Sequence, residues 1–508
     1  TWAQTDVTST YLTNADFSQS TAINNHLCGY GKDMADQSTT YYGLQDVTGW
    51  TKVVLNGITD ESGYTNCGMG GAVFAYGSEY QLKGNNVAAP ATNPSGEATG
   101  NALGFFGVWG CGGYYYQSVT LPAGTYTLTV PTYCQSGTQV NTSYIGFISA
   151  DASYLGVTNT TVGEWVNQTI DFTLVEETSG KIALGYLSTG SGSGANPHLF
   201  FDKVAISYSS EITYPIDMTG RVSNWDFLGC TNGNFPSWTI SAPNGGNTWK
   251  NGDSAVEYWI GTAANGSFDY YQTINNLPAG KYTISASMWN STNNESGASV
   301  NGNAGVYGTS SATTVFAGVT DDIDNQAMKT YTTEQINVID GTLRIGVKNN
   351  GTMGARWFGV DWIKLTLVAA PDLSDYVSAY EAALAKAQDV DQTEKMAASL
   401  LSALQNAIAT YGNVDKTSIS AMAEATNALN AAADAATTSI ASYAVIAAGT
   451  IPDNSLNGWT CENTNDFVIN TWSVEGNSGN DPSGMVTPFI QNWVAKGSYL
   501  GAGKVYYK

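Results

Sequence analysis

Charged residues are scarce in this sequence, and basic residues are the scarcest. Only 12% of the 508 residues are charged, and 19 Lys and Arg stand against 42 Asp and Glu, which gives a formal net charge of −23. A nucleic-acid-binding protein needs a basic surface that replaces the counterions of the phosphates. The sequence has no basic run, so it predicts no nucleic-acid partner and disfavours an anionic membrane surface as a partner.

Histidine is also nearly missing, which limits the chemistry of the chain. There are two, His26 and His198, so a zinc site of three histidines cannot form and a Ser-His-Asp triad would have to use one of them. No phosphate-binding Gly-Lys-Ser/Thr loop and no His-Glu-x-x-His motif is present. A carboxylate pair for glycoside hydrolysis depends only on spatial separation and stays open. The sequence therefore predicts a non-catalytic chain, with a catalytic domain beyond residue 508 as an open alternative.

Long apolar runs are absent, whereas glycine and aromatic residues are abundant. No run approaches the length of a transmembrane helix, so no transmembrane segment is predicted. The chain has 56 Gly, 30 Tyr and 14 Trp. With many Thr, Ser and Asn, this mixture favours short twisted strands joined by turns, and the aromatic content argues against disorder. The length suits three or four domains.

One β-sandwich module recurs along the chain. Its first copy shows, in order, Asn14-Ala15-Asp16-Phe17, Gly49-Trp50, Leu121-Pro122-Ala123-Gly124 and Phe200-Phe201-Asp202-Lys203-Val204-Ala205-Ile206. The second copy repeats this order with Asn224-Trp225-Asp226-Phe227, Ser237-Trp238, Leu277-Pro278-Ala279-Gly280 and Phe358-Gly359-Val360-Asp361-Trp362-Ile363-Lys364-Leu365. After Leu277-Pro278-Ala279-Gly280, the segment Tyr282-Thr283-Ile284-Ser285-Ala286 alternates apolar and polar residues, as a half-buried strand does. We therefore predict a mainly β fold of repeated sandwiches, in which Trp50, Trp238 and Trp459 belong to the cores.

A third copy is expected to begin at Gly458-Trp459 and to stop before its Leu-Pro-Ala-Gly turn. A sandwich without half of its strands would expose open edges, so we expect the sequence to be a fragment of a longer protein. Between the second and third copies the apolar period changes to that of helices, which end at Gly412 and at Gly449. A three-helix spacer bundle is predicted there, with a coiled-coil oligomerisation segment as the alternative. The predicted domains are residues 1–212, 213–369, 370–449 and 450–508.

Four cysteines lie in the first copy and allow three disulfide connectivities. Cys111 and Cys134 flank the Leu-Pro-Ala-Gly turn almost symmetrically. If this turn joins paired strands, the two cysteines face each other, and Cys28 is left with Cys67. The alternative is four buried thiols, because free cysteine is among the most buried residue types. We favour disulfides, since the composition is typical of extracellular proteins.

The shared motifs resemble those of carbohydrate-binding jelly rolls of the family 4, 9 and 22 type, in the galactose-binding-like group of folds. The resemblance covers residues 1–212 and 213–369 and part of 450–508. The helical stretch from Tyr376 to Ala387 resembles the FIVAR-type bundles of bacterial surface proteins. The resemblance implies an exported, extracellular or cell-surface bacterial protein that handles polysaccharide. It also implies a structural calcium ion held by Asp16 with Asp202 and by Asp226 with Asp361, since hard oxygen ligands suit calcium. The alternative is that these carboxylates cap turns or face solvent.

Aromatic side chains are the candidates for glycan contact, because flat rings pack on the C–H faces of sugars while amides bind the hydroxyls. Trp289 and Tyr133 occupy the same place after the turn, and Asn290 follows Trp289. Trp109 and Trp259 lie ahead of the turn and precede the shared segments Tyr115-Tyr116-Gln117 and Tyr270-Tyr271-Gln272. An aromatic residue in a sandwich is more often core than ligand platform, and that alternative stays open.

Three functions fit the repeat. The first is a glycan-binding or adhesive protein. The second is a structural subunit of an extracellular stalk or filament, with self-association of its sandwiches. The third is the accessory region of a larger polysaccharide-degrading enzyme.

Overall fold

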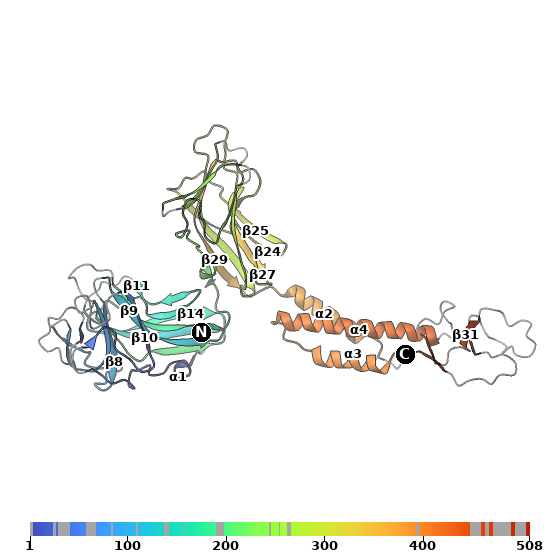
Figure 1. Cartoon of the computed structure of the whole chain (residues 1–508), viewed down its shortest axis with the longest axis horizontal. Helices are drawn as coiled ribbons and strands as arrows, with labels where there is room; N and C mark the ends of the chain where they lie inside the picture. Colours follow the sequence, from blue (N-terminus) through green and yellow to red (C-terminus); the bar gives the residue numbers. More distant parts are fainter. Residues whose placement is uncertain are drawn as a thin grey trace, which may run out of the picture. The chain divides into compact units, whose positions relative to one another are not determined.

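The computed structural model of the chain divides into two compact units, Thr1–Pro371 and Asp372–Lys508 (Figure 1). It describes residues 4–507 apart from 24–26, 29–40, 57–67, 83–84, 108–109, 137–141, 158, 189–197, 243–244, 253–254, 262–265, 393–395, 448–458, 463–466, 471–488 and 493–503. No helix among the described residues is long and apolar enough to cross a membrane.

The first sandwich consists of two antiparallel sheets that enclose one hydrophobic core. One sheet has the order β1 (Thr5–Asp6), β17 (Ala205–Ser209), β10 (Gly124–Ser136), β16 (His198–Phe201), β8 (Asn101–Gly107) and β5 (Met69–Ala75), and β14 (Trp165–Leu174) pairs with β10. The other has the order β13 (Ser153–Leu155), β12 (Gly146–Ser149), β15 (Thr178–Leu187), β9 (Gly112–Leu121) and β4 (Thr51–Asn56), and β11 (Thr142–Ser143) pairs with β15. A short helix, α1 (Thr8–Tyr11), follows β1.

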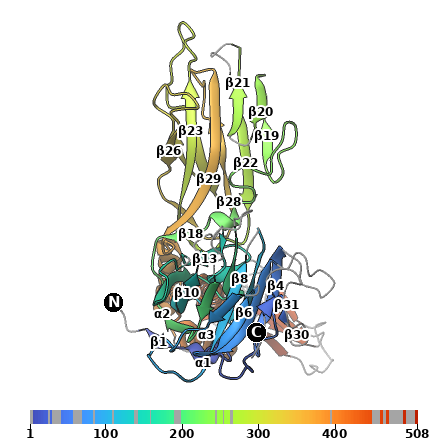
Figure 2. The ribbon, with the colours of Figure 1, turned by 90° about the vertical axis from the view of Figure 1, so that its left-hand side faces the viewer.

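The second sandwich has the same construction (Figure 2). Its first sheet has the order β20 (Asn247–Asn251), β21 (Ala255–Trp259), β29 (Trp357–Ala369), β23 (Gly280–Ser291) and β26 (Lys329–Thr332), with β18 (Ile216–Asp217) on β29 and β27 (Ile336–Val338) on β23. Its second sheet has the order β19 (Thr239–Ser241), β22 (Asp269–Ile274), β28 (Leu343–Asn349), β24 (Ala304–Ser310) and β25 (Thr313–Gly318).

Strand pairing confirms the repeated sandwich. In the first sheets, β5, β8 and β10 of the first copy correspond to β20, β21 and β23 of the second. There β16 and β17 together correspond to the single long strand β29, and β14 corresponds to β26 and β27 together. In the second sheets, the strands β4, β9, β15, β12 and β13 correspond in this order to β19, β22, β28, β24 and β25. The Leu-Pro-Ala-Gly turn, however, does not join paired strands. It carries the chain from β9 in one sheet to β10 in the other, and from β22 to β23 in the second copy. The condition under which Cys111 and Cys134 would face each other, that this turn joins paired strands, is therefore not met.

The Asn-x-Asp-Phe motif forms the same turn in both copies. Asn14 and Asn224 adopt positive φ angles of 50° and 52°, which asparagine tolerates better than most residues. The carbonyl oxygen of Asn14 accepts a hydrogen bond from Trp50 Nε1 at 3.1 Å, and that of Asn224 accepts one from Trp238 Nε1 at 3.0 Å. Both indoles are buried, so their assignment to the cores is confirmed.

The first sandwich carries an additional layer that has no counterpart among the described residues of the second. A small sheet of order β3 (Tyr41–Tyr42), β2 (Leu27–Cys28), β6 (Glu79–Leu82) and β7 (Asn85–Ala88) belongs to it. Side chains of this region form a second hydrophobic cluster with the outer face of the β5–β8–β16 sheet; its buried members include Phe74, Tyr80, Phe106 and Phe200. The inserted segment therefore covers one face of the first sandwich.

The second unit contains the predicted three helices, α2 (Ser374–Asp389), α3 (Ala398–Tyr411) and α4 (Ile419–Ala447). They pack around Tyr380, Leu404, Met422 and Leu429, and small alanines at Ala383, Ala387, Ala425, Ala433 and Ala436 complete the core. Four short strands follow: β30 (Trp459–Glu462) pairs with β33 (Lys504–Tyr507), and β31 (Phe467–Asn470) pairs with β32 (Phe489–Asn492). The pairing of β30 with β33 matches that of β4 with β9 and of β19 with β22. The side chain of Trp459 lies outside the described residues.

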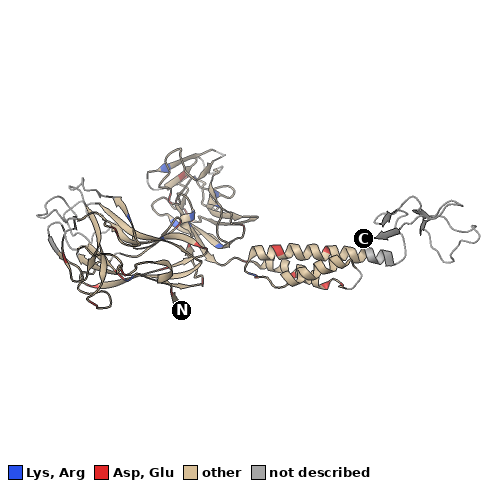
Figure 3. Cartoon of the chain, turned by 60° about the horizontal axis from the view of Figure 1, so that its bottom comes forward, with Lys and Arg blue, Asp and Glu red and all other residues tan. Residues whose placement is uncertain are grey.

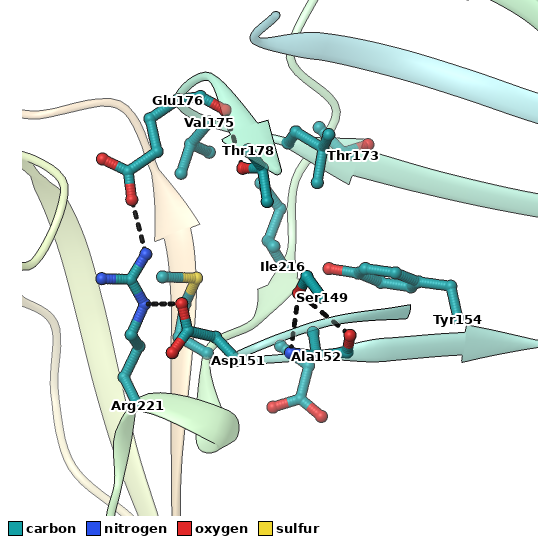
Figure 4. A pocket seen from close by; sticks show the side chains of 13 residues that line it. Ser149, Asp151, Ala152, Tyr154, Thr173, Val175, Glu176, Thr178, Ile216 and Arg221 are labelled. Carbon is teal, nitrogen blue, oxygen red and sulfur yellow. Dashed lines mark hydrogen bonds and ion pairs between the residues drawn. The ribbon is translucent and has the colours of Figure 1, made fainter. Parts of the chain in front are cut away.

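The two sandwiches of the first unit contact each other at a polar junction (Figure 4). Arg221, in the 3-10 turn η2 (Thr219–Arg221), lies with Nε 3.0 Å from Asp151 Oδ2 and with Nη2 2.5 Å from Glu176 Oε1. A side chain at Gly220 would overlap the carbonyl oxygen of Asp151, so glycine permits this close approach. Val175 of the first sandwich also packs against the core of the second.

Candidate functional site

Tryptophans gather on the outer face of the first sheet of the second sandwich. Tyr282, Ile284, Ala286 and Met288 of β23 point into the core, so the alternation of a strand places Trp289 on the opposite face. Paired residues of neighbouring strands share a face. The register forms one outer row from Trp249, Glu257, Gly359 and Trp289, and a second from Asn247, Trp259, Trp357 and Ser291.

Three of these indoles are accessible and surround a shallow depression. Trp249, Trp259 and Trp357 are partly exposed, and with Asn247 and Asn293 they line a volume of about 540 Å³. Trp259 and Trp357 meet edge to face, with their ring centres 6.4 Å apart. We term these five residues the tryptophan platform. Flat rings beside exposed amides are the groups that a sugar ring requires.

A buried carboxylate holds the platform in place. Glu257, 1% exposed, accepts a hydrogen bond from Trp357 Nε1 at 2.9 Å and one from Asn251 Nδ2 at 2.8 Å. Both carboxylate oxygens therefore have a partner, which a buried charged group requires. The first bond fixes the orientation of the Trp357 indole. Glu257 thus acts through Trp357 as a positioning residue.

Arg356 supports the platform from its side. Its guanidinium carbon lies 4.4 Å from the centre of the Trp259 ring, a cation–π distance. Its Nη2 donates to the carbonyl oxygen of Gly261 at 2.9 Å, and its Nε lies 3.6 Å from Glu295 Oε2. These contacts fix Trp259 between a cation and Trp357, so the platform is organised before any ligand binds.

Of the ligand-binding residues predicted from the sequence, Trp259 lies in the platform, but Trp289 and Asn290 do not. Both are fully buried, so the prediction that they contact a ligand directly is wrong. Trp289 lies beneath the platform, its ring over Gly359 and 5.7 Å from the ring centre of Trp357. Neither its Nε1 nor the side-chain amide atoms of Asn290 have a hydrogen-bond partner among the described residues.

The equivalent face of the first sandwich is covered by the chain itself. Tyr133, the predicted counterpart of Trp289, is half-buried, with Trp165 at 5.4 Å and Phe200 at 6.4 Å between ring centres. Tyr80 of the inserted strand β6 stacks on Phe74 at 4.0 Å. The face is therefore no platform in this copy. Trp109 lies outside the described residues.

His198 occupies the register position that Trp357 has in the second sandwich. A ring nitrogen of His198 lies 2.8 Å from the Tyr80 hydroxyl. Burial lowers the pKa of His198 to about 3, so the imidazole is neutral at ordinary pH. His26 lies outside the described residues.

The predicted calcium ligands have partners within the protein. Asp202 is 2% exposed and accepts hydrogen bonds from the Tyr76 hydroxyl and, at 2.7 Å, from the backbone N–H of Lys203. Asp16 accepts from the N–H of Ser18 at 3.2 Å, so it caps the turn of the first motif. Its counterpart Asp226 accepts from the N–H of Leu228 at 3.2 Å.

Asp361, the fourth predicted ligand, lies in a β-bulge of β29. Burial raises the pKa of Asp361; Lys250 lowers it and Asp226 raises it further. Among the described residues no cluster of three or more His, Cys, Asp and Glu side chains is placed to hold a metal. Calcium binding by the two aspartate pairs stays a prediction.

The predicted disulfide between Cys111 and Cys134 is not formed. Cys134 lies on β10 and Cys111 just before β9, and these strands belong to different sheets because the turn between them crosses the sandwich. Burial raises the pKa of the Cys111 thiol. The side chain of Cys28 and all of Cys67 lie outside the described residues, so their pairing stays a prediction.

Two of the three platform tryptophans, Trp249 and Trp357, were missed in the sequence. A signal for Trp249 existed, because Asn247-Thr248-Trp249 recurs as Asn470-Thr471-Trp472 in the third copy. Trp357 carries no comparable signal, since its counterpart in the first copy is His198. Only the pairing of β21 with β29 places Trp357 beside Trp259.

No protein-family model matches the chain, and no curated protein matches its sequence. Among solved structures, parts of the chain are similar to a CBM61 module in complex with β-1,4-galactotriose, at 20% identity over 28% of this chain and 96% of that one, with a TM-score of 0.22. The CBM22-1–CBM22-2 tandem domain of Xyn10C from Paenibacillus barcinonensis is 12% identical over 72% of this chain and 100% of that one, with a TM-score of 0.23. A Stig cyclase from Fischerella sp. is 17% identical over 29% and 96%, with a TM-score of 0.24. Because binding modules and a cyclase occur together at such low scores, these likenesses decide neither family nor ligand, and the function must be argued from the site.

Proposed function

We propose that the second sandwich binds a glycan on the tryptophan platform and that the chain is a non-catalytic, exported glycan-binding protein. The observation that carries the proposal is the platform itself, with three partly exposed indoles around a depression that also presents Asn247 and Asn293. Solvent-exposed aromatic groups in a cluster mark interaction sites, whereas single ones need no explanation. The bound partner would pack the C–H faces of its sugar rings on the indoles and direct hydroxyls to the amides.

The wider proposal concerns the first sandwich and the helices. The insertion that covers the aromatic face of the first sandwich supports a structural role for that copy, and the buried neutral His198 supports the absence of catalysis there. The three-helix bundle would act as a FIVAR-like spacer. Export and a cell-surface location are implied by the resemblance to carbohydrate-binding jelly rolls and FIVAR-type bundles, and they remain part of this proposal.

The test is affinity electrophoresis of the full chain in gels that contain a panel of neutral and acidic polysaccharides. We expect at least one polysaccharide to retard the protein, and Trp357→Ala to weaken this retardation about tenfold or more, since a buried aromatic contact contributes 1–3 kcal/mol. Tyr271→Ala is the matched control, because this tyrosine is partly exposed on the other sheet of the same sandwich, beneath Arg344 at 3.4 Å. Equal retardation of the wild type and Trp357→Ala would refute the platform.

A further inference from the structure

A second aromatic cluster lies on the same outer face as the platform, farther along β29. It consists of Trp225, Trp362 and Lys364, and we term it the Lys364 cluster. Lys364 Nζ lies 4.7 Å from the ring centre of Trp362 and 5.2 Å from that of Trp225. All three side chains are partly exposed. Two indole rings and one ammonium group are thus presented to solvent together.

A β-bulge directs this cluster to the outer face. Met288 pairs with Val360 and Ser287 pairs with Trp362, so Asp361 is an extra residue in β29. The extra residue reverses the alternation of the strand. Before it Phe358 and Val360 point into the core, and after it Ile363 and Leu365 do. Trp362 and Lys364 consequently share the outer face with Trp357.

The sandwich itself does not require the cluster. The shared motifs align Asp16 with Asp226 and Asp202 with Asp361. The positions of Trp225, Trp362 and Lys364 are therefore occupied in the first copy by Ala15, Lys203 and Ala205. These residues serve the same backbone positions, since Val204 donates to the Ala15 carbonyl oxygen at 3.1 Å just as Ile363 donates to that of Trp225 at 2.8 Å. The two tryptophans and the lysine are therefore features of the second copy alone; Trp225 also packs against the core, whereas Trp362 is not among the described residues that do.

Lys364 is not neutralised by a carboxylate. Within the described part of the chain its side chain forms neither an ion pair nor a hydrogen bond, and its contacts are the two rings. Two other cations at this sheet do have acidic partners: Lys329 Nζ lies 2.6 Å from Asp321 Oδ2, and Arg356 Nε lies 3.6 Å from Glu295 Oε2. An ammonium group held over ring faces keeps its N–H donors for an additional anionic partner. The Lys364 ammonium group is therefore available to an anion from outside the chain.

We propose that the Lys364 cluster is a subsite for an acidic sugar, a uronate whose carboxylate pairs with Lys364 while its ring packs on Trp362 and Trp225. The subsite belongs to the same glycan chain that the platform binds, so the inference rests on the proposed function. Because β29 carries both groups on one face, the glycan runs along this strand. The ligand class is therefore an acidic polysaccharide rather than a single terminal sugar.

The test compares each acidic polysaccharide with its own carboxyl-reduced, neutral form by affinity electrophoresis of the full chain. Polygalacturonate, alginate and glucuronoxylan are suitable probes. Lys364→Met removes the charge but keeps an unbranched side chain between the indoles. Lys329→Met is the matched control, because it removes a lysine of the same sheet that already has an acidic partner.

We expect at least one acidic form to retard the wild-type protein more than its reduced form does. Lys364→Met should weaken binding of the acidic form roughly three- to fivefold, the size of an exposed ion pair, and leave the reduced form unchanged. Added salt should weaken only the acidic form. Trp362→Ala should weaken both forms.

Two failures are distinguishable. If a glycan binds and Trp357→Ala abolishes the binding, but carboxyl reduction and Lys364→Met change nothing, the acidic subsite is overturned and the platform stands. If no member of the panel binds, both proposals fall.

Discussion

Asp202 shows how one buried carboxyl group responds to its surroundings. Burial raises the pKa of Asp202 to about 6, although the hydrogen bonds from Tyr76 and Lys203 lower it. The folded protein therefore binds a proton at this carboxyl more tightly than the unfolded chain, where the pKa of Asp is about 3.9. Stability from this group is complete below the unfolded pKa and is lost as the pH rises through about 6.

The prediction at this scale is that the first sandwich is less stable at pH 7 than at pH 4.5 through Asp202. The difference between these two pH values should be about 2 kcal/mol, since one unit of pKa corresponds to about 1.4 kcal/mol and part of the change already occurs below pH 4.5. Asp202→Asn keeps an acceptor for the Tyr76 hydroxyl and should flatten this dependence. Scanning calorimetry between pH 4 and pH 7 measures it, with Asp171→Asn, an exposed carboxylate of β14, as the control. An unchanged pH profile in Asp202→Asn would contradict the argument.

At the scale of the element, β29 combines core positions with the outward positions proposed to bind a ligand. Its residues Phe358, Val360, Ile363 and Leu365 belong to the core, whereas Trp357, Trp362 and Lys364 face outward because of the bulge at Asp361. Between the two outer groups lies Gly359, on which the Trp289 ring rests. A side chain at position 359 would displace the Trp289 ring, on which the platform rests, so this position requires glycine.

Gly359→Ala should destabilise the second sandwich by roughly 1–3 kcal/mol, the usual cost of overpacking. A Cβ atom at this position would overlap the six-membered ring of Trp289, and Trp289 in turn contacts Trp357. Glycan binding should weaken together with stability. Gly261→Ala is the control, because a Cβ there meets nothing within 4 Å. Chemical denaturation of the two variants measures the difference, and equal midpoints would contradict the expected overlap.

At the scale of the whole molecule, the two sandwiches of the first unit contact each other at the junction around Arg221. Arg221 is paired with Asp151 and Glu176, whose side chains are 43% and 45% exposed. Such partly exposed pairs contribute little to folding and weaken in salt. Basic side chains are few and scattered over the described residues (Figure 3). Few other cations could therefore replace Arg221 in its ion pairs with Asp151 and Glu176.

Arg221→Ala should loosen the junction without unfolding either sandwich. The connecting segment 210–215 should then be cleaved several-fold faster in limited proteolysis, and salt near 1 M should produce the same effect in the wild-type protein. Lys329→Ala, which removes the ion pair with Asp321 elsewhere in the second sandwich, is the control. If cleavage rates of all three proteins agree, the ion pairs do not hold the junction.

Much of the scaffold could be read from the sequence because its determinants are local and repeated. The recurring turn and strand motifs predicted the sandwiches, the buried Trp50 and Trp238, and the change to helices after residue 369. Each of these features depends on apolar period and turn chemistry within a few residues. Structural features that depend on such local patterns can therefore be predicted from the sequence alone.

The exposed face of each strand was decided only by the tertiary structure. Trp289 and Trp357 are both tryptophans of one sheet, yet the first is buried beneath the second, because the register of β29 with β21 and β23 sets their positions. Tyr80 covers the aromatic face of the first sandwich through an insertion far from β16 in sequence. Exposure depends on what distant segments place over a side chain, and no local pattern carries that information. The sequence by itself thus determined the repeated scaffold, and the tertiary structure determined in which copy the aromatic face is exposed.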